Sequence, residues 1–175
     1  MKILYVGAEV VPFVSTGGLG DVLGSLPAAI AKNPENDVRV ILPLHKSVKA
    51  KFGASLNFVG ETTVHLSWRN QYCGLFSLER DGVIYYFVDN EYYFNRDAIY
   101  GHFDDGERYS FFGKAVLDIM PLINFYPDIL HTNDWQSAMS VVYLKRKYCS
   151  NSNYSRIKTI YTILQQNLLM IIDYM

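Results

Sequence analysis

The sequence predicts an α/β fold in which a parallel sheet carries an inserted antiparallel hairpin. Residues 3–8 are a continuous apolar run without alternation, the pattern of a strand buried on both faces, and residues 38–42, Val-Arg-Val-Ile-Leu, predict a second buried strand. A glycine-containing loop and a segment with helical spacing of apolar residues separate them, which makes a βαβ unit. Arg80-Asp81-Gly82 joins two short β-like segments and is a hairpin turn signal.

The other elements follow from the same periodicities. Pro27 and Pro121 fall inside two expected helices, where a ring without an N–H kinks the helix, and Pro127 closes a connection. The expected strands are residues 3–8, 37–44, 62–66, 71–78, 83–88, 128–132 and 158–163, and the expected helices are residues 19–32, 107–125 and 135–147.

The composition is that of one globular domain. The chain has 175 residues, of which 50% are hydrophobic and 19% charged, so it can build a core and is not a disordered tail. Its net charge of -1 creates no field that favours nucleic acid or an anionic membrane, and we expect neither as a partner.

Cysteine usage and the N-terminal segment indicate a reduced compartment. Cys73 and Cys149 form no CxxC pair and no zinc-spaced cluster with histidine, so we expect no metal site. The first apolar run is short and is interrupted by Glu9, unlike a signal peptide. No stretch reaches the roughly 20 apolar residues of a membrane span, and we therefore expect a soluble cytoplasmic protein.

The first candidate site is the segment Ser15-Thr16-Gly17-Gly18-Leu19-Gly20-Asp21-Val22, between a strand and a helix. Its adjacent glycines let a ligand approach the backbone, and the N-terminus of the next helix favours a phosphate. The spacing matches neither the dinucleotide fingerprint nor the P-loop. A phosphate-binding loop and a tight turn that only starts a helix both stay open.

The second candidate site is His131-Thr132-Asn133-Asp134-Trp135-Gln136, at the end of a buried strand. Ligands of open α/β sheets bind outside the carboxyl ends of the strands. A carboxylate that accepts from hydroxyls beside a flat indole suits a sugar. The alternative is that Asp134 caps the next helix while Trp135 packs in the core.

The third candidate site is Tyr100-Gly101-His102-Phe103-Asp104-Asp105-Gly106-Glu107-Arg108, ahead of a helix. Its paired acids fit general acid–base chemistry. The alternative, which we favour from the residues alone, is a solvated loop whose Asp105 caps the helix.

These three segments, in this order and spacing, resemble bacterial glycogen synthase and plant starch synthase. The resemblance covers residues 1 to about 163. The matching stretches are Glu9–Phe13, Thr16–Val22, Leu26–Ala29, Val38–Pro43, Tyr100, Glu107–Phe112 and Pro127–Gln136.

The resemblance implies a retaining glucosyltransferase that moves glucose from ADP-glucose to the non-reducing end of an α-1,4-glucan in glycogen biosynthesis. It implies no metal and no cofactor, with ADP-glucose as a substrate. The fold it implies is a Rossmann-like doubly wound parallel sheet with an antiparallel hairpin insertion, the N-terminal half of a GT-B glycosyltransferase. The family's reaction relies on positioning and on electrostatic stabilisation of a leaving phosphate.

The resemblance also assigns roles to residues. Ser15, Thr16, Gly17 and Gly18 are expected to lie at the phosphates of the nucleotide sugar, and Asp21 is expected to order that loop.

The sugar side of the expected site lies on the two later segments. Tyr100, Asp134, Trp135 and Gln136 are expected to face glucose or the glucan acceptor, with Asp134 taking part in catalysis.

Three positions depart from the family pattern. Ser15 stands where the family usually has a lysine opposite the diphosphate; a hydrogen bond to a charged group contributes about 1.5–3 kcal/mol, so its loss weakens binding roughly 10–100-fold. Gln136 replaces a common histidine, a milder change because glutamine also forms hydrogen bonds. Leu164 occupies the position of a histidine that in the family lies near the transferred sugar.

The resemblance predicts two parts of the chain. Residues 1–163 are an incomplete N-terminal catalytic domain, and residues 164–175 are a divergent tail. A frameshift is our hypothesis for the tail, because codons for residues 167–171 read in a shifted frame can spell a family-like Leu-Ala-Tyr-Asp. We expect no appreciable synthase activity from this chain alone, and self-association through an exposed core surface.

Other functions stay open at this point. A non-catalytic fragment that holds glucan through Tyr100, Asp134 and Trp135 would bind it independently of ADP-glucose. A decayed gene product would have no function. An unrelated nucleotide-binding protein requires three ordered motifs to coincide.

Overall fold

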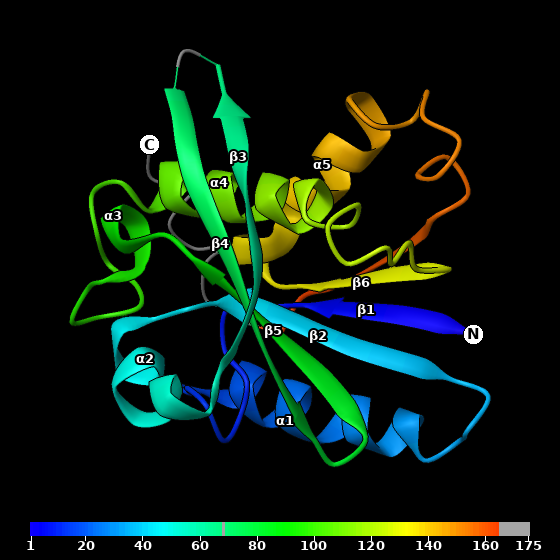
Figure 1. The fold of residues 1–175 in the computed structure, drawn as a ribbon, viewed down its shortest axis with the longest axis horizontal. Coiled ribbons are helices and arrows are strands. Elements are labelled where there is room, and N and C mark those ends of the chain that lie inside the picture. Colours follow the sequence, from blue (N-terminus) through cyan, green and yellow to red (C-terminus); the bar gives the residue numbers. More distant parts are fainter. Residues whose placement is uncertain (68, 165–175) are drawn as a thin grey trace.

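The computed structural model describes residues 1–67 and 69–164, which form one sheet with helices on both faces (Figure 1). The strands lie in the order β3-β4-β5-β2-β1-β6-β7. Their bounds are β1 Lys2–Val6, β2 Asp37–Pro43, β3 Asn57–Leu66, β4 Arg69–Arg80, β5 Val83–Asp89, β6 Ile129–Asn133 and β7 Lys158–Thr162. The helices are α1 Gly18–Ala31, α2 Lys46–Phe52, α3 Glu91–Phe94, α4 Asp105–Asp118 and α5 Ala138–Arg146, with 3-10 turns η1 Gly53–Ser55 and η2 Trp135–Ser137.

The centre of the sheet is parallel and covered on both faces. Strands β5, β2, β1, β6 and β7 pair in parallel, and Figure 1 shows α1 and α2 on one face with α4 and α5 on the other. Along β1, Ile3 and Tyr5 pack into the core beneath α1, while Leu4 and Val6 pack into the core beneath α4. This alternation buries both faces and confirms the predicted Rossmann-like α/β fold.

The predicted hairpin extends the main sheet. Its turn residues Asp81 and Gly82 both have positive φ, 52° and 75°, as a tight hairpin turn requires. Strand β4 is longer than expected, and β5 pairs antiparallel with β4 on one side and parallel with β2 on the other. The far end of the β3–β4 hairpin rises beside α4 (Figure 1).

Two helix predictions need different corrections. Helix α1 runs from Gly18 to Ala31 without a break at Pro27, which is buried in it. Helix α4, expected to continue to residue 125, ends at Asp118. Proline disfavours a helical conformation in the residue before it, so Pro121 stops the helix, and Asn124 then turns the chain with a φ of 46°.

The two expected caps are also wrong. Asp105 is the first residue of α4, and its carboxylate accepts from the amides of Gly101 and His102 in the preceding loop at 2.8 and 3.2 Å. Asp134 makes no side-chain cap to the 3-10 turn η2, with which the expected helix at 135–147 begins before α5.

Strand β7 forms an apolar edge of the sheet. It pairs with β6, and four side chains at or after it are strongly exposed: Ile160 44%, Tyr161 44%, Ile163 56% and Leu164 37%. We call these four residues the β7 edge. They agree with the apolar patch that the sequence analysis expected to be exposed. The tail beyond Leu164, and with it the frameshift hypothesis, lies outside the described residues.

Candidate functional site

The first predicted site lies where β1 ends and α1 begins, at the carboxyl edge of the parallel strands. Gly17 and Gly18 are exposed, and a Cβ added to either would meet no atom within 4 Å. Gly17 has a φ of -172°, which any residue adopts. Neither packing nor backbone conformation within this chain therefore requires glycine here, and the open space suits a ligand that approaches the backbone.

The start of α1 is electrostatically suited to an anion. Gly17 is the N-cap and supplies no side-chain cap, so the first-turn N–H groups of this 14-residue helix lack a side-chain partner at the cap position. Such a terminus carries a partial positive charge. Asp21 lies exposed in the first turn, and Ser15 donates its hydroxyl to the carbonyl oxygen of Gly17 at 3.1 Å.

Ser15 also lies close against the helix. A Cβ added to Gly20 would come within 2.4 Å of the Ser15 hydroxyl oxygen and 2.6 Å of its Cβ, so the close approach of Ser15 requires glycine at position 20. The segment from Ser15 to Gly20 is therefore a compact turn whose glycines serve two purposes: Gly20 admits the chain, while Gly17 and Gly18 leave space outside it.

Glu9 lies at the centre of these contacts, and the sequence analysis assigned it no role. It is fully buried just after β1, and its carboxylate accepts hydrogen bonds from both the amide and the hydroxyl of Thr16, the latter at 2.9 Å. The same carboxylate accepts from the Tyr100 hydroxyl at 2.7 Å. One carboxylate thus connects the turn of residues 15–20, which we call the glycine loop, to the segment that carries Tyr100. The available signal was an acidic residue interrupting an apolar strand.

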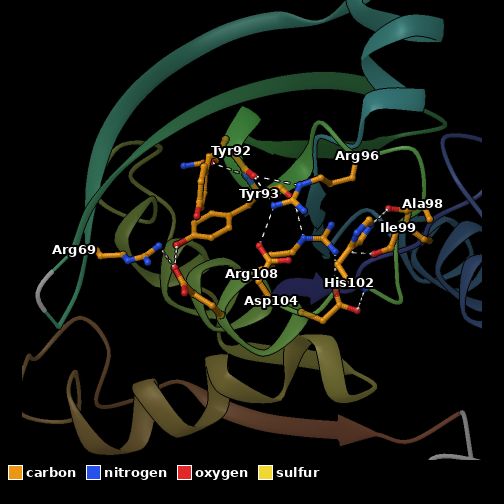
Figure 2. Close-up of polar contacts among 12 residues, drawn as sticks. Arg69, Tyr92, Tyr93, Arg96, Ala98, Ile99, His102, Asp104 and Arg108 are labelled. Atoms are coloured by element: carbon orange, nitrogen blue, oxygen red, sulfur yellow. Dashed lines mark hydrogen bonds and ion pairs between the residues drawn. The ribbon is translucent and has the colours of Figure 1, made fainter.

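Side chains of helix α4 hold the segment that carries Tyr100 in place. Figure 2 shows the side chain of Arg108 reaching toward the backbone of Tyr93 and Ile99, to whose carbonyl oxygens it donates at 2.7 and 3.4 Å. Arg108 is fully buried and also pairs with Asp105. The Tyr109 hydroxyl donates to the Ile99 carbonyl oxygen at 2.6 Å. Arg108 and Tyr109 of helix α4 therefore support the loop that carries Tyr100.

The second predicted segment lies beside Tyr100. The ring of Trp135 is 5.9 Å from that of Tyr100 and 5.0 Å from that of Tyr109, centroid to centroid. Burial, and then the hydrogen bond to Glu9, raise the pKa of Tyr100, so its hydroxyl stays protonated and donating. The structure thus brings Thr16 and Tyr100 together at Glu9, with Trp135 beside Tyr100.

Asp134 and Leu164 meet at the edge of this cluster. Asp134 is 1% exposed, has a φ of 57°, and its carboxylate accepts from the Leu164 amide at 2.6 Å. Its own amide donates to the Thr162 carbonyl oxygen at 2.8 Å. The backbone of Leu164 therefore lies at the carboxylate for which the resemblance implies a catalytic role.

Gln136 lies in the interior and not on an open surface. It is 0% exposed, and within residues 1–67 and 69–164 neither of its side-chain amide atoms has a hydrogen-bond partner. Gln136 was expected to compensate for the missing histidine by forming hydrogen bonds, but its side chain has no partner in this part of the chain.

A separate cavity of about 560 Å³ lies between the β3–β4 hairpin and helices α4 and α5; Gly106 and Glu107 of the third candidate segment line it, but none of the residues expected at the nucleotide or the sugar does. On its wall Arg69 donates to Glu107 at 2.6 Å, and Glu107 also accepts from the Tyr93 hydroxyl at 2.6 Å. Figure 2 shows Arg69 to the left of Arg108.

The described residues offer no metal centre, since no three histidine, cysteine, aspartate or glutamate side chains among them gather to hold an ion. No helix in the described ranges has the length and apolarity needed to cross a bilayer. Both cysteines are free thiols, and burial raises the pKa of Cys73 to about 12, whereas Cys149 is exposed.

Comparisons with known proteins identify relatives of this chain. The glycogen synthases of Anoxybacillus flavithermus and Bacillus cereus (strain B4264) are 48% and 50% identical over 163 residues, 93% of this chain and 34% of each relative. The chain thus spans about a third of the length of these relatives. The catalytic domain of Starch Synthase IV from Arabidopsis thaliana, solved with ADP and acarbose, has the same fold, with a TM-score of 0.78, 23% identity, and coverage of 92% of this chain and 33% of that one. The family model for the starch synthase catalytic domain matches residues 2–167, and the chain belongs to that family.

Proposed function

We propose that this chain is part of the N-terminal catalytic domain of a glycogen synthase. The complete enzyme would be a retaining glucosyltransferase that moves glucose from ADP-glucose to the non-reducing end of an α-1,4-glucan. The glycine loop carries the proposal, because Gly17 and Gly18 leave open space at an uncapped helix N-terminus. That arrangement suits the phosphates of ADP-glucose.

The sugar would lie on the other side of Glu9. Tyr100 and Trp135 offer aromatic surface, and the neighbouring carboxylate of Asp134 is the acceptor that we propose for sugar hydroxyls or for developing positive charge. In this proposal Ser15, Thr16, Gly17, Gly18 and Asp21 contact or order the nucleotide side, and Tyr100, Asp134, Trp135 and Gln136 form or support the sugar side.

The reaction in this proposal needs no cofactor and no metal, and the cytoplasm is the proposed compartment. The chain covers 34% of its relatives, so the opposing wall of a two-domain cleft would come from the other two-thirds of a synthase. We propose that residues 1–175 alone do not transfer glucose at an appreciable rate.

Calorimetric titration of the chain with ADP-glucose and with a malto-oligosaccharide, alongside a glucosyl-transfer assay, tests this proposal. Binding of ADP-glucose that is lost in Gly17→Val supports it, because the added side chain fills the open space. Glucan binding without any binding of ADP-glucose would favour a glucan-holding fragment instead. Absence of binding by either ligand would contradict a ligand site in the isolated chain.

A further inference from the structure

The carboxylate of Glu9 is buried without a cation beside it. It is 0% exposed, and within the described part of the chain no lysine, arginine or histidine forms an ion pair with it. A buried charge is costly unless hydrogen bonds compensate it. Here three donors do so: the amide and hydroxyl of Thr16, and the hydroxyl of Tyr100.

These three donors come from two segments that have separate supports. Thr16 belongs to the turn before α1, where Ser15 and Gly20 pack closely. Tyr100 belongs to the loop held by α4, 91 residues from Glu9 in sequence. Glu9 therefore connects the proposed nucleotide side and the proposed sugar side through one charged group.

The bonds to Thr16 also restrict how the glycines are presented. With both its amide and its hydroxyl held by Glu9, residue 16 has a fixed backbone orientation, and Gly17 follows directly. A change at Tyr100 that shifts the carboxylate must then shift or loosen the bonds to Thr16. Conversely, a ligand that orders the glycine loop must also restrain the Glu9 carboxylate and, through it, Tyr100.

We infer that Glu9 is a positioning residue that couples the glycine loop to the Tyr100 loop, so that ordering of one loop orders the other. This inference rests on the proposed function for the identity of the two ligand sides. The coupling itself is a property of the free chain and is measurable without any ligand.

The experiment uses the full chain and residue-resolved amide hydrogen exchange. Tyr100→Phe removes one hydroxyl from Glu9, and we expect exchange of the Thr16 amide to accelerate about two- to tenfold, the effect of one ordinary hydrogen bond. Tyr148→Phe is the matched control, because the Tyr148 hydroxyl donates to the Asp118 carboxylate at the other end of α4. It should leave Thr16 exchange unchanged.

The reciprocal variant and the conservative variant complete the test. Thr16→Val should accelerate exchange at Gly101 and His102, next to Tyr100. In a Glu9→Gln background, Tyr100→Phe should no longer affect the Thr16 amide. Unchanged exchange at Thr16 in Tyr100→Phe, or an equal effect of the control, would overturn the coupling.

A ligand measurement separates this inference from the proposed function. With ADP as the probe, Tyr100→Phe should weaken binding about two- to tenfold while Tyr148→Phe leaves it unchanged. If the unmodified chain does not bind ADP, the proposed function fails in this chain, and the exchange results still decide the coupling. If ADP binds but Tyr100→Phe does not weaken it, the two loops are uncoupled in the bound state and the inference is wrong.

Discussion

The hydroxyl of Tyr100 donates to the carboxylate of Glu9 over 2.7 Å, although 91 residues separate them in the chain. This contact joins the carboxyl end of β1 to the loop before α4. The same carboxylate holds Thr16, and the ring of Tyr100 lies 5.9 Å from that of Trp135. Two of the three segments that resemble the synthases therefore meet at one buried carboxylate, and the third contacts them through the ring of Tyr100.

The support of the Tyr100 loop predicts a large effect at Arg108. Arg108→Met removes the donors to the Tyr93 and Ile99 carbonyl oxygens and leaves Asp105 without its buried partner. We expect a loss of about 3–5 kcal/mol in the free energy of unfolding, measured by urea denaturation. Arg80→Met is the control, since the exposed pair of Arg80 should contribute at most about 1 kcal/mol. Equal losses in the two variants would contradict the assigned support.

Acid should destabilise the chain through His45. Burial, and then the nearby charge of Arg108, lower the pKa of His45 to about 4 from 6.5, while its Nε2–H donates to the Ala8 carbonyl oxygen at 3.0 Å. The unfolded chain then binds more protons than the folded chain between these pH values. His45 therefore leaves the free energy of unfolding undiminished above pH 6.5. As the pH falls toward 4, protonation of this residue in the unfolded chain lowers the free energy of unfolding by about 3 kcal/mol in all.

Urea denaturation at several pH values measures this effect. His45→Gln removes the titrating group, so its free energy of unfolding should fall less steeply between pH 6.5 and 4 than that of the unmodified chain. Parallel curves for the two proteins would show that His45 is not the group responsible.

Restoring a lysine at position 15 should strengthen nucleotide binding. Ser15 lies in the turn whose glycines leave open space at the start of α1, so Ser15→Lys puts an ammonium group beside the proposed diphosphate position. We expect the Kd for ADP to fall roughly 10–100-fold, less so at high salt. Ser25→Lys places the same charge further along α1. An equal gain from both variants would indicate general attraction and not a contact in the loop.

The β7 edge predicts concentration-dependent self-association. An unpaired strand edge with exposed apolar side chains is a template for another chain. Ile160→Lys should reduce the larger species seen in sedimentation velocity. Val142→Lys on α5 is the matched control, because Val142 is 47% exposed and Ile160 is 44% exposed. A monomer at all concentrations, or an equal effect of both variants, would exclude this surface.

The sheet and the location of the glycine loop were predictable because burial leaves a direct record in the sequence. Strands covered on both faces need predominantly apolar runs, and β1 and β2 have them, with Arg39 the one charged residue between the apolar positions of β2. The end of α4 was not predictable from the sequence, because Ile119, Leu122 and Ile123 continue the helical spacing while Pro121 stops the helix.

The central contact of the site was not predictable either. Glu9 reads in sequence only as a break in an apolar run, and nothing local reveals a partner as distant as Tyr100. The burial of Gln136 was not predictable either, because it is a polar residue in a motif expected to face a ligand and is nevertheless fully buried.

Titration of the isotope-labelled chain with ADP, followed by the amide NMR signals of Gly17 and Gly18, tests the central claim most directly. The account predicts saturable shifts of these two signals, with smaller shifts at Gly101 and His102 transmitted through Glu9. Binding without any change at Gly17 and Gly18, or with shifts confined to the cavity wall at Arg69 and Glu107, would contradict it.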